Sequence, residues 1–366
     1  MTVPAPPLTI RPPKLWLPRH VQVTAAAAEQ PHTAGILRRL EAAGVTDVQL
    51  LRSNRLVGLN EGNEREVYAR AKATMAVVVA PPSAIKPQPI PPSADWRIDL
   101  ARGCPAHCQY CYLAGSLQGP PVTRVFANLD DVLAGIGTHV GRGAVTSGTA
   151  ARGHEGTTFE LSCYTDPLAL EHLTGSLAAA IERVGTGQYG DAAIRFTTKF
   201  DAVEDLLDLS HGGRTRMRVS VNSDEVARRF EGGTATVPAR LTAMRRMAQA
   251  GYPVGLTVAP IMPVGDWRSS YGALLDDVTT ALDGVPDVDL TIEAITHRFT
   301  DNSKQVLLDW YPRTRLEMDE SLRTQKRTKF GGAKYVYPRD VMAELRSWFT
   351  DAAATRLPGA PLLYWT

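Results

Sequence analysis

The stretch GCPAHCQYCYL, residues 103–113, holds three of the four cysteines of this 366-residue chain. Three residues separate Cys104 from Cys108, and two residues separate Cys108 from Cys111. The stretch continues directly from RIDLARG, residues 97–103, which has the pattern of a β-strand. We therefore expect the cysteines on a loop at the carboxyl end of a strand, where enzymes of the barrel class place their chemistry.

Three closely spaced thiols suit two kinds of metal site. Structural zinc sites prefer four ligands, and His107 could complete a Cys3His set, although it lies inside the tight loop. Thiolates also hold iron–sulfur clusters, and three protein ligands leave one iron of a [4Fe-4S] cluster open to an exogenous ligand. We favour a cluster held by Cys104, Cys108 and Cys111, with zinc or three unrelated cysteines as the alternatives.

The composition narrows the class of protein. With 44% hydrophobic residues, the chain can bury a substantial core as one large domain or two ordinary ones. Four cysteines do not make a disulfide framework, and no stretch approaches the roughly 20 apolar residues of a membrane span. The first residues show no signal peptide, so we expect a cytoplasmic protein with no membrane partner. The formal net charge of +2 does not by itself indicate a polyanionic partner.

Proline-rich stretches divide the chain. Residues 1–13 are expected to be a disordered tail, and APPSAIKPQPIPPSADW, residues 80–96, is expected to be an extended linker. The rest of the chain is expected to form an N-terminal α/β segment, a main domain and a C-terminal extension, over residues 14–79, 97–300 and 301–366.

Six segments of the main domain have the apolar or alternating pattern of strands: RIDLARG (97–103), TTFELSC (157–163), AAIRFTTK (192–199), MRVSVNS (217–223), PVGLTVAP (253–260) and VDLTIEAITH (288–297). Helical patterns lie between them, over residues 167–185, 201–209, 237–251 and 271–284. Strands that alternate with helices predict a parallel sheet. We therefore predict an α/β fold whose main domain is a partial (β/α)6 barrel of the TIM type.

The C-terminal extension breaks this alternation. KRTKFGGAKYVYP, residues 326–338, predicts two short strands joined through Gly-Gly, and RDVMAELRSWFTDAA, residues 339–353, predicts a helix. The predicted β-hairpin carries basic and aromatic residues: Arg327, Lys329, Lys334, Tyr335 and Tyr337. Basic runs are commonly solvated faces, so the hairpin alone does not indicate a nucleic-acid partner.

The CxxxCxxC spacing, its place after the first strand and the aromatic residue before the last cysteine resemble the radical S-adenosylmethionine superfamily. The resemblance implies a [4Fe-4S] cluster whose open iron binds S-adenosyl-L-methionine, and a 5′-deoxyadenosyl radical formed by reductive cleavage. It also implies a full or partial barrel, in agreement with the six predicted strands. An electron donor such as flavodoxin or ferredoxin is then expected as a partner.

The fourth cysteine, Cys163, ends the second predicted strand, at the same end of the sheet as the cysteine loop. A lone cysteine at such a position is commonly a small buried apolar residue. Its place at a barrel mouth favours a functional role, because a radical site needs a hydrogen-atom donor with a weak bond to hydrogen.

Further motifs, in their order along the chain, resemble the spore photoproduct lyases, which revert the thymine dimer 5-thyminyl-5,6-dihydrothymine in DNA. These motifs are GCPAHCQYCYL, SCYTDPLALEHLT, TTKF, RVSVNS, AGYPVGLTVAPI, EAITHRFT, YPRTRLEMDE and KFGGAKYVY. The resemblance implies that Cys163 gives its hydrogen atom to the thymine radical. It also implies that Tyr110 and Tyr112 help to return the radical toward the cofactor, with simple packing as the alternative for both tyrosines.

Polar residues at other strand ends complete the expected cofactor site. Lys199 ends the third strand and could bind the methionine carboxylate, with a surface lysine as the alternative. Thr165 stands where the family has a small hydroxyl residue near the cofactor. Ser220 and Asn222 end the fourth strand and could bind ribose or methionine, with turn chemistry as the alternative.

The substrate implied by the resemblance is double-stranded DNA that carries a thymine dimer, bound by a monomer. The basic residues of the predicted hairpin could bind phosphate, and Tyr335 or Tyr337 could fill the space left by a flipped dimer. His297 and Arg298, at the end of the sixth strand, could also face substrate phosphate. A hydrogen-bonded core histidine is the alternative for His297.

Two other functions remain open from the sequence. A related radical enzyme could act on another nucleobase or nucleoside, because Tyr164 and the long segment at 136–157 depart from the compact spacing expected before the second strand. An iron–sulfur redox sensor that binds nucleic acid would use the same three cysteines. Such a sensor has no use for Cys163 and Lys199 at the barrel mouth.

Overall fold

The structure is a computed structural model that describes residues 13–116, 119–327 and 332–366. The expected disordered tail, apart from Pro13, and the hairpin residue Lys329 therefore lie outside the described residues. Within the described ranges, no helix is both long and apolar enough to cross a membrane.

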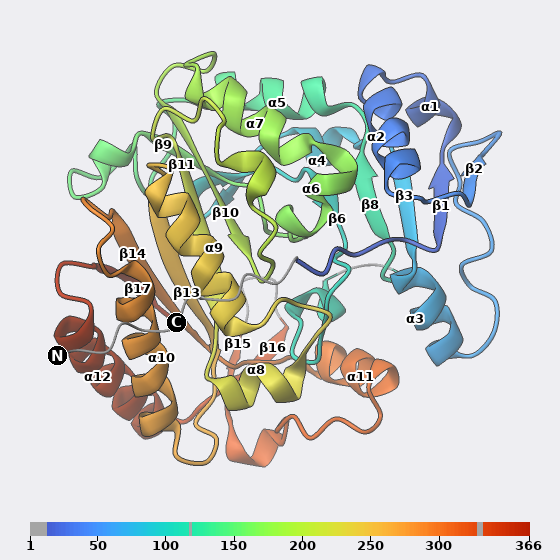
Figure 1. The fold of residues 1–366 in the computed structure, drawn as a ribbon. Coiled ribbons are helices and arrows are strands. Elements are labelled where there is room, and N and C mark those ends of the chain that lie inside the picture. Colours follow the sequence, from blue (N-terminus) through green and yellow to red (C-terminus); the bar gives the residue numbers. More distant parts are fainter. Residues whose placement is uncertain (1–12, 117–118, 328–331) are drawn as a thin grey trace, which may run out of the picture.

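An open, curled sheet of eight strands forms the centre of the molecule (Figure 1). Its strand order is β17 (Leu362–Trp365), β14 (Leu290–Thr296), β13 (Val254–Ile261), β11 (Thr215–Val221), β10 (Ala192–Thr198), β9 (Thr157–Glu160), β5 (Ala94–Arg97) and β4 (Gln88–Ile90). All neighbours are parallel except β4 and β5. Five of the six predicted strands are present and lie side by side in chain order, so the predicted α/β class and parallel sheet are confirmed. The strand predicted over 97–103 is divided instead: Arg97 ends β5, whereas Ala101–Arg102 form a short strand of a second sheet.

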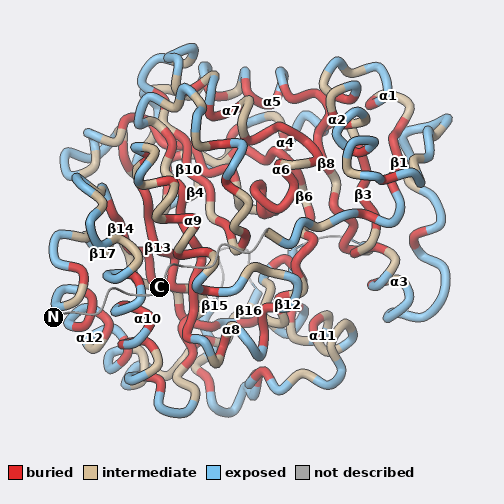
Figure 2. The backbone as a smooth tube through the Cα atoms, viewed as in Figure 1, coloured by how far each residue is buried: buried red, intermediate tan, exposed pale blue. Residues whose placement is uncertain are grey.

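Helices cover the outer face of this sheet, and the strands between them are buried (Figure 2). Apart from α11, which is described below, the helices after β9 are α6 (Leu168–Thr174), α7 (Ser176–Gly185), α8 (Asp224–Phe230), α9 (Val237–Gln249), α10 (Trp267–Leu282) and α12 (Arg339–Arg356). Side chains alternate between the two faces of each strand. In β11, Met217, Val219 and Val221 belong to the apolar core, whereas Arg218 and Ser220 point to the inner face.

The six β/α units are less regular than predicted. The helix expected over 201–209 is a single 3-10 turn, η3 (Glu204–Leu206). The Asp201 carbonyl accepts a hydrogen bond from the Val203 amide at 3.0 Å, a tight turn that competes with helix formation. The helix expected over 167–185 is divided into α6 and α7 at Gly175, whose φ is +64° and where a Cβ atom would lie 2.7 Å from the Arg39 guanidinium.

A second, smaller sheet contains the N-terminal segment. Its strand order is β2 (Val48–Leu50), β1 (His20–Val23), β3 (Thr74–Val78), β8 (Thr123–Phe126) and β6 (Ala101–Arg102), with α1 (Ala25–Ala28), α2 (Pro31–Ala42), α3 (Glu64–Lys72) and α5 (Leu129–Gly137) in the same part of the chain. After β5 the chain leaves the large sheet. It then contributes β6 and, after the cysteine loop, β8 to the smaller sheet. The N-terminal segment and the cysteine loop are therefore joined through one sheet.

Residues 80–96 are more regular than an extended linker. They contain α4 (Pro82–Ile85), β4 and the start of β5. Pro89 is tolerated in β4 because this strand lies at the edge of the large sheet, where a missing amide donor breaks no ladder. The boundaries of the proposed domains stay a prediction, but this segment is part of the sheet.

The C-terminal extension begins with α11 (Asp301–Trp310) and the 3-10 turn η4 (Glu320–Leu322). The predicted hairpin follows as β15 (Thr324–Arg327) and β16 (Ala333–Val336), which are antiparallel. The predicted helix is α12, and the chain then adds β17 to the edge of the large sheet, a strand that the sequence did not indicate.

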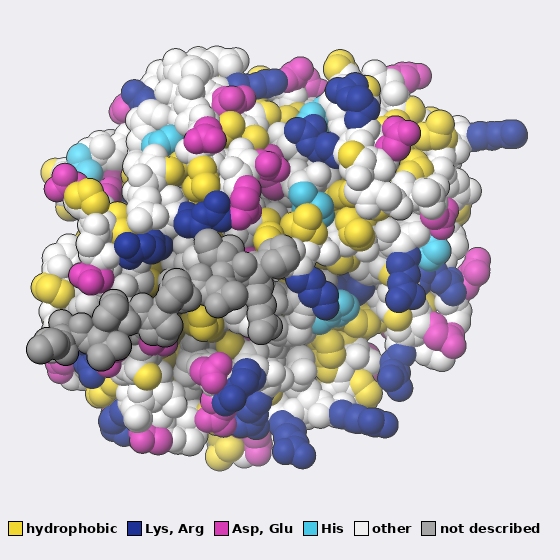
Figure 3. Space-filling view, viewed as in Figure 1, with side chains coloured by type: hydrophobic (Ala, Val, Ile, Leu, Met, Phe, Trp, Pro, Cys, Tyr) yellow, Lys and Arg dark blue, Asp and Glu magenta, His cyan; other side chains and the backbone are white. Residues whose placement is uncertain are grey.

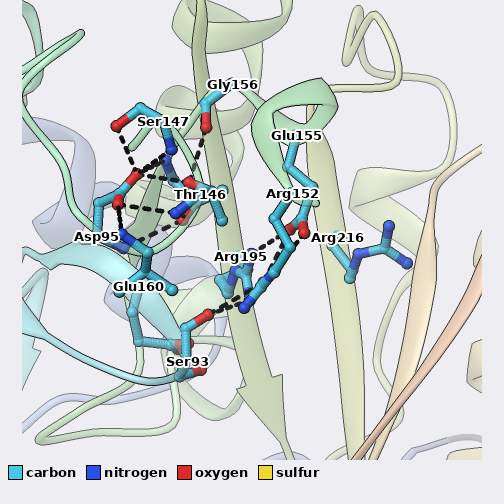
Figure 4. A network of polar contacts seen from close by, with 12 residues as sticks. Ser93, Asp95, Thr146, Ser147, Arg152, Glu155, Gly156, Glu160, Arg195 and Arg216 are labelled. Atoms are coloured by element: carbon cyan, nitrogen blue, oxygen red, sulfur yellow. Dashed lines mark hydrogen bonds and ion pairs between the residues drawn. The ribbon is translucent and has the colours of Figure 1, made fainter. Parts of the chain in front are cut away.

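The long segment that precedes β9 is fastened to β5 by one carboxylate (Figure 4). Asp95 accepts hydrogen bonds from the amides of Val145 at 2.6 Å, Thr146 at 3.0 Å and Ser147 at 3.2 Å, and from the amide of Thr158 at 3.2 Å. Burial would raise the pKa of Asp95, but the hydrogen bonds from Thr146, Val145 and Ser147 outweigh it and hold the pKa at about 2.

We expect Asp95→Asn to lower the free energy of unfolding at neutral pH by about 1.5–3 kcal/mol, because the amide keeps one acceptor but loses the charge and sets an N–H group against N–H donors. The pKa of Asp95 is depressed from 3.8 to about 2 in the folded state, so its contribution is present above pH 3.8 and is lost as the pH falls toward 2. Urea unfolding of both proteins should therefore show a smaller difference at about pH 3 than at pH 7.

Asp351→Asn, a change at an exposed position on α12, is the matched control and should lie within about 0.5 kcal/mol of wild type. A difference for Asp95→Asn that is equally large at both pH values would contradict the role of its charge.

Candidate active site

A cavity of about 620 Å³ lies at the carboxyl ends of the large sheet's strands. Eleven of the residues expected in the site line it: Cys104, Cys108, Tyr110, Cys111, Tyr112, Cys163, Thr165, Lys199, Ser220, His297 and Arg298. Asn222 and the described hairpin residues Arg327, Lys334, Tyr335 and Tyr337 do not line it. The structure thus brings together the cysteines and most of the strand-end residues.

The cysteine loop is held from three sides. Gly103 has φ +91°, and a Cβ atom there would lie 2.3 Å from the Val122 carbonyl oxygen, so this position needs glycine. The buried ammonium of Lys72, at the end of α3, donates to the carbonyls of Cys104 and Ala106. Within the loop, β7 (His107–Cys108) pairs with β12 (Glu231–Gly232), and η1 (Tyr112–Gly115) follows the last cysteine.

The three thiols of the loop are free and share one cavity. Burial raises the pKa of Cys104 to about 12 and raises the pKa values of Cys108 and Cys111 as well, so the loop needs a cationic partner to hold thiolates. Among the described residues, no three Cys, His, Asp or Glu side chains are already gathered in a metal-binding geometry. The fit to a cluster therefore rests on the donor type and on the shared cavity.

The alternative Cys3His zinc site is not favoured by the geometry. The Nδ1 atom of His107 lies 2.8 Å from the Tyr68 hydroxyl, which also contacts the Tyr311 hydroxyl. His107 is not among the residues that line the cavity. Its ring is engaged by Tyr68 of α3 instead.

One buried carboxylate organises the cavity wall below the loop. Glu231 accepts from the Tyr110 hydroxyl and forms ion pairs with Lys199 at 3.3 Å and with Arg240 at 2.6 Å. Lys199 also donates to the Ser220 hydroxyl at 2.6 Å. Burial would raise the pKa of Glu231, but the charges of Lys199 and Arg240 hold it below its ordinary value. Sequence reasoning found three members of this network and missed Glu231 and Arg240.

Cys163 faces the same cavity from the end of β9. The Tyr112 hydroxyl donates to the Cys163 carbonyl oxygen, which ties the cysteine loop to this strand end. Burial and the nearby carboxylate of Asp99 raise the pKa of the Cys163 thiol to about 12, against the opposing charge of Arg97. Cys163 is therefore a neutral thiol near pH 7 and keeps its hydrogen.

The remaining expected cofactor residues differ in their surroundings. The hydroxyl oxygen of Thr165 lines the cavity and is buried without a hydrogen-bond partner among the described residues, which leaves it available to a ligand. Asn222 is fully buried instead, donates to the Pro260 carbonyl at 2.7 Å and accepts from the Tyr271 hydroxyl at 2.6 Å. Its side chain supports the wall from behind.

The floor of the cavity carries a buried ion-pair network. The guanidinium of Arg218 donates to Glu160 and to Glu293, from strands on either side of β11. Gly255, in the strand next to β11, makes room for this arginine, because a Cβ atom there would lie 2.9 Å from the Arg218 side chain.

The hairpin aromatics are packed against neighbours. The ring of Tyr335 stacks on Phe299 with centroids 5.2 Å apart, and Arg323 lies 3.8 Å from the ring centroid of Tyr337. Arg323 also donates to the His297 carbonyl at 3.1 Å.

The cations expected to meet substrate phosphate differ in exposure. His297 is 2% exposed, and burial and the charge of Arg323 lower its pKa to about 3, so it is neutral near pH 7. Arg298 and Arg327 are exposed, and Lys334 is half-buried.

Sequence comparison agrees with this geometry. A model of the spore photoproduct lyase family matches residues 16–366. The chain belongs to the spore photoproduct lyase family. It is 37% identical to the spore photoproduct lyase of a Geobacillus species over 96% of this chain and all of that protein, and 34% identical to that of Bacillus subtilis over 96% and 99%.

Solved structures of the family have the same fold. A spore photoproduct lyase complexed with dinucleoside spore photoproduct superimposes with a TM-score of 0.87 at 36% identity, over 96% of this chain and all of that one. A double mutant with bound AdoMet and the same dinucleoside gives the same TM-score. The resemblance inferred from the sequence motifs is confirmed.

We expect Glu231→Ala to lower the free energy of unfolding by about 3–5 kcal/mol, because it leaves the buried cations Lys199 and Arg240 without their shared partner. Glu225→Ala is the matched control: it removes a carboxylate whose partner Arg229 is partly exposed, and should cost less than about 1 kcal/mol. Urea unfolding of both variants tests this. Equal small losses would show that Glu231 does not hold the network.

Proposed function

We propose that this protein is a DNA repair lyase that reverts spore photoproduct, 5-thyminyl-5,6-dihydrothymine, to two thymines by radical S-adenosylmethionine chemistry. The observation that carries the proposal is a single cavity lined by the three free thiols of the CxxxCxxC loop, by Lys199 and Ser220, and by the separate thiol of Cys163. Relatives in the family are known in complex with AdoMet and with dinucleoside spore photoproduct.

The cofactor residues have distinct parts in this proposal. Cys104, Cys108 and Cys111 hold a [4Fe-4S] cluster, and Lys199, Ser220 and Thr165 bind S-adenosyl-L-methionine. Together these groups supply a 5′-deoxyadenosyl radical. The ammonium of Lys199 suits a carboxylate ligand, and the unpartnered hydroxyl of Thr165 suits a polar one. Asn222 contributes by holding Pro260 in place rather than by touching the ligand.

Cys163 is the proposed hydrogen-atom donor. Its thiol is protonated near pH 7 because its pKa is about 12, so a complete S–H group faces the cavity. Tyr112 and Tyr110 are the proposed relay back toward the cofactor. The Tyr112 hydroxyl contacts the backbone of Cys163, and the Tyr110 hydroxyl contacts Glu231 beside Lys199, so the two phenols connect the two halves of the cavity.

The proposed partners are lesion-bearing duplex DNA and an electron donor such as flavodoxin or ferredoxin, with the protein acting as a monomer in the cytoplasm. Arg327, Lys329, Lys334 and the hairpin tyrosines are the proposed DNA contacts, with Arg298 at the cavity rim. Lys and Arg side chains near α3, α8 and α11 are interspersed with Asp and Glu side chains (Figure 3).

The alternatives make different use of the same cavity. A related radical enzyme that acts on another nucleobase or nucleoside would keep the cofactor residues and change the substrate wall. An iron–sulfur sensor would leave Cys163 and Lys199 without a role. Both thiol and lysine face the cavity, which supports an enzyme over a sensor.

The test is anaerobic reconstitution with iron and sulfide, followed by incubation with S-adenosyl-L-methionine, dithionite and the dinucleotide spore photoproduct. We expect 5′-deoxyadenosine and repaired thymidine dinucleotide in the wild-type reaction. Cys111→Ala should lose bound iron, the brown absorption and both products, because two thiolates do not retain a cluster. If Cys111→Ala kept four irons and cleaved the cofactor normally, the cluster assignment would be wrong. If the wild-type protein cleaved the cofactor but did not repair the dinucleotide, a different substrate would be favoured.

We expect Cys163→Ala to bind a normal cluster and to cleave the cofactor, because neither step uses this thiol. The thymine radical would then be quenched by small reductants, so abnormal adducts should replace repaired thymines. A packing role would instead cost on the order of 1 kcal/mol of stability and leave the products unchanged. Chromatography of the anaerobic reaction distinguishes the two, and clean repair at near wild-type yield would exclude the donor role.

A further inference from the structure

One cation inside the cavity forms no salt bridge with any residue that the structure describes. Among the described residues, four Lys or Arg side chains line the cavity: Arg97, Lys199, Arg218 and Arg298. Lys199 is paired with Glu231 and Arg218 with two glutamates, while Arg298 lies exposed at the rim. Arg97 is half-buried and, within the described parts of the chain, forms no ion pair with a carboxylate.

The position of Arg97 is set by β5 and by a tyrosine. Arg97 ends β5, next to β9, whose following residues include Cys163. Its guanidinium carbon lies 4.5 Å from the ring centroid of Tyr164, so the charged plane is supported by an aromatic face. Tyr164 directly follows Cys163 in the chain, and the side chains of Arg97 and Cys163 both line the cavity.

Arg102, which lies beside the same tyrosine, is paired with a carboxylate and so differs from Arg97. Arg102 lies 5.3 Å from the centroid of the same Tyr164 ring, but it donates to Asp99 at 3.1 Å and does not line the cavity. The Tyr164 carbonyl accepts from the Gly103 amide at 2.8 Å, so this tyrosine is fixed against the cysteine loop. Tyr164 is thus held in place between two arginines. The charge of Arg102 is neutralised by Asp99, whereas the guanidinium of Arg97 faces the cavity.

An unpaired guanidinium in a partly buried cavity favours an anionic ligand. Burying a charge is costly unless it is paired, and the planar fork of arginine matches the oxygens of a phosphate. In a DNA lesion made of two neighbouring thymines, the group of that chemistry nearest to the reacting bases is the phosphodiester that joins the two nucleosides. Cys163 marks the place of the reacting base, and Arg97 lies beside it.

We propose that Arg97, supported by the ring of Tyr164, binds the phosphodiester that links the two thymidines of the lesion. This inference rests on the proposed function and deepens it, because it assigns the recognition of the substrate backbone to a residue inside the cavity. Tyr164, which departs from the expected family pattern, then serves as a positioning residue for this cation.

The experiment compares two substrates that differ only in this group: the dinucleotide spore photoproduct and the dinucleoside spore photoproduct, which lacks the phosphate. Affinities are measured by calorimetry on the reconstituted protein without reductant, and repair rates are measured with reductant. For Arg97→Ala we expect a loss of about 10- to 100-fold in affinity for the dinucleotide and a change of less than about twofold for the dinucleoside.

Three further variants sharpen the comparison. Arg97→Lys keeps the charge and should retain part of the preference for the dinucleotide, and it remains informative if the alanine variant folds poorly. Tyr164→Phe keeps the aromatic support and should behave as wild type, whereas Tyr164→Ala should weaken dinucleotide binding selectively. Arg313→Ala, at an exposed position outside the cavity, should leave both affinities unchanged.

The outcomes separate this inference from the proposed function. Equal losses on both substrates, or no loss on either, would overturn the phosphate contact while wild-type repair stands. If wild-type protein binds and repairs neither substrate, the proposed function fails, and the assignment of Arg97 fails with it.

Discussion

A charge that is buried on the inner face of the curled sheet costs free energy unless a group of opposite charge lies beside it. Arg218 meets this requirement across the sheet, since Glu160 and Glu293 approach it from strands on either side of β11. The alternation of side chains along each strand makes this arrangement possible, because apolar residues face the helices while charged ones face inward. The cavity therefore has a rigid polar floor.

The same requirement shapes the mouth of the cavity. Glu231 compensates Lys199 and Arg240 together, and it reaches them because β12 pairs with β7 inside the cysteine loop. The loop and the lysine that we assign to the cofactor are thus fixed relative to each other by one short pairing. Lys72 adds a second attachment, since its buried ammonium is satisfied by loop carbonyls rather than by a carboxylate. Displacing the loop would leave this charge unsatisfied.

Residues at strand ends could be predicted from the sequence, and their partners could not. Cys163, Lys199 and Ser220 each follow an apolar run, and parallel strands bring their carboxyl ends to one edge. Glu231 comes from a two-residue strand with no periodic pattern, and its role depends on contacts far along the chain. The prolines of residues 80–96 suggested a linker, because nothing local shows that β4 pairs at a sheet edge. Asn222 ends a strand as expected, yet its amide is used by Pro260 and Tyr271.

The segment at 136–157, which the sequence marked as a departure from the family spacing, is connected to the cavity wall through Ser93 (Figure 4). Arg152 donates to the carbonyl of Ser93 at 3.3 Å, and the Ser93 hydroxyl accepts from Arg218 at 2.7 Å. Ser93 lines the cavity and lies in the same stretch of chain as Asp95 and Arg97. The inserted segment is therefore in contact with the part of the cavity wall that contains Ser93, in the same stretch of chain as Arg97. In the function that we propose, this wall belongs to the substrate side of the cavity, and the cysteine loop and Glu231 hold the side that we assign to the cofactor.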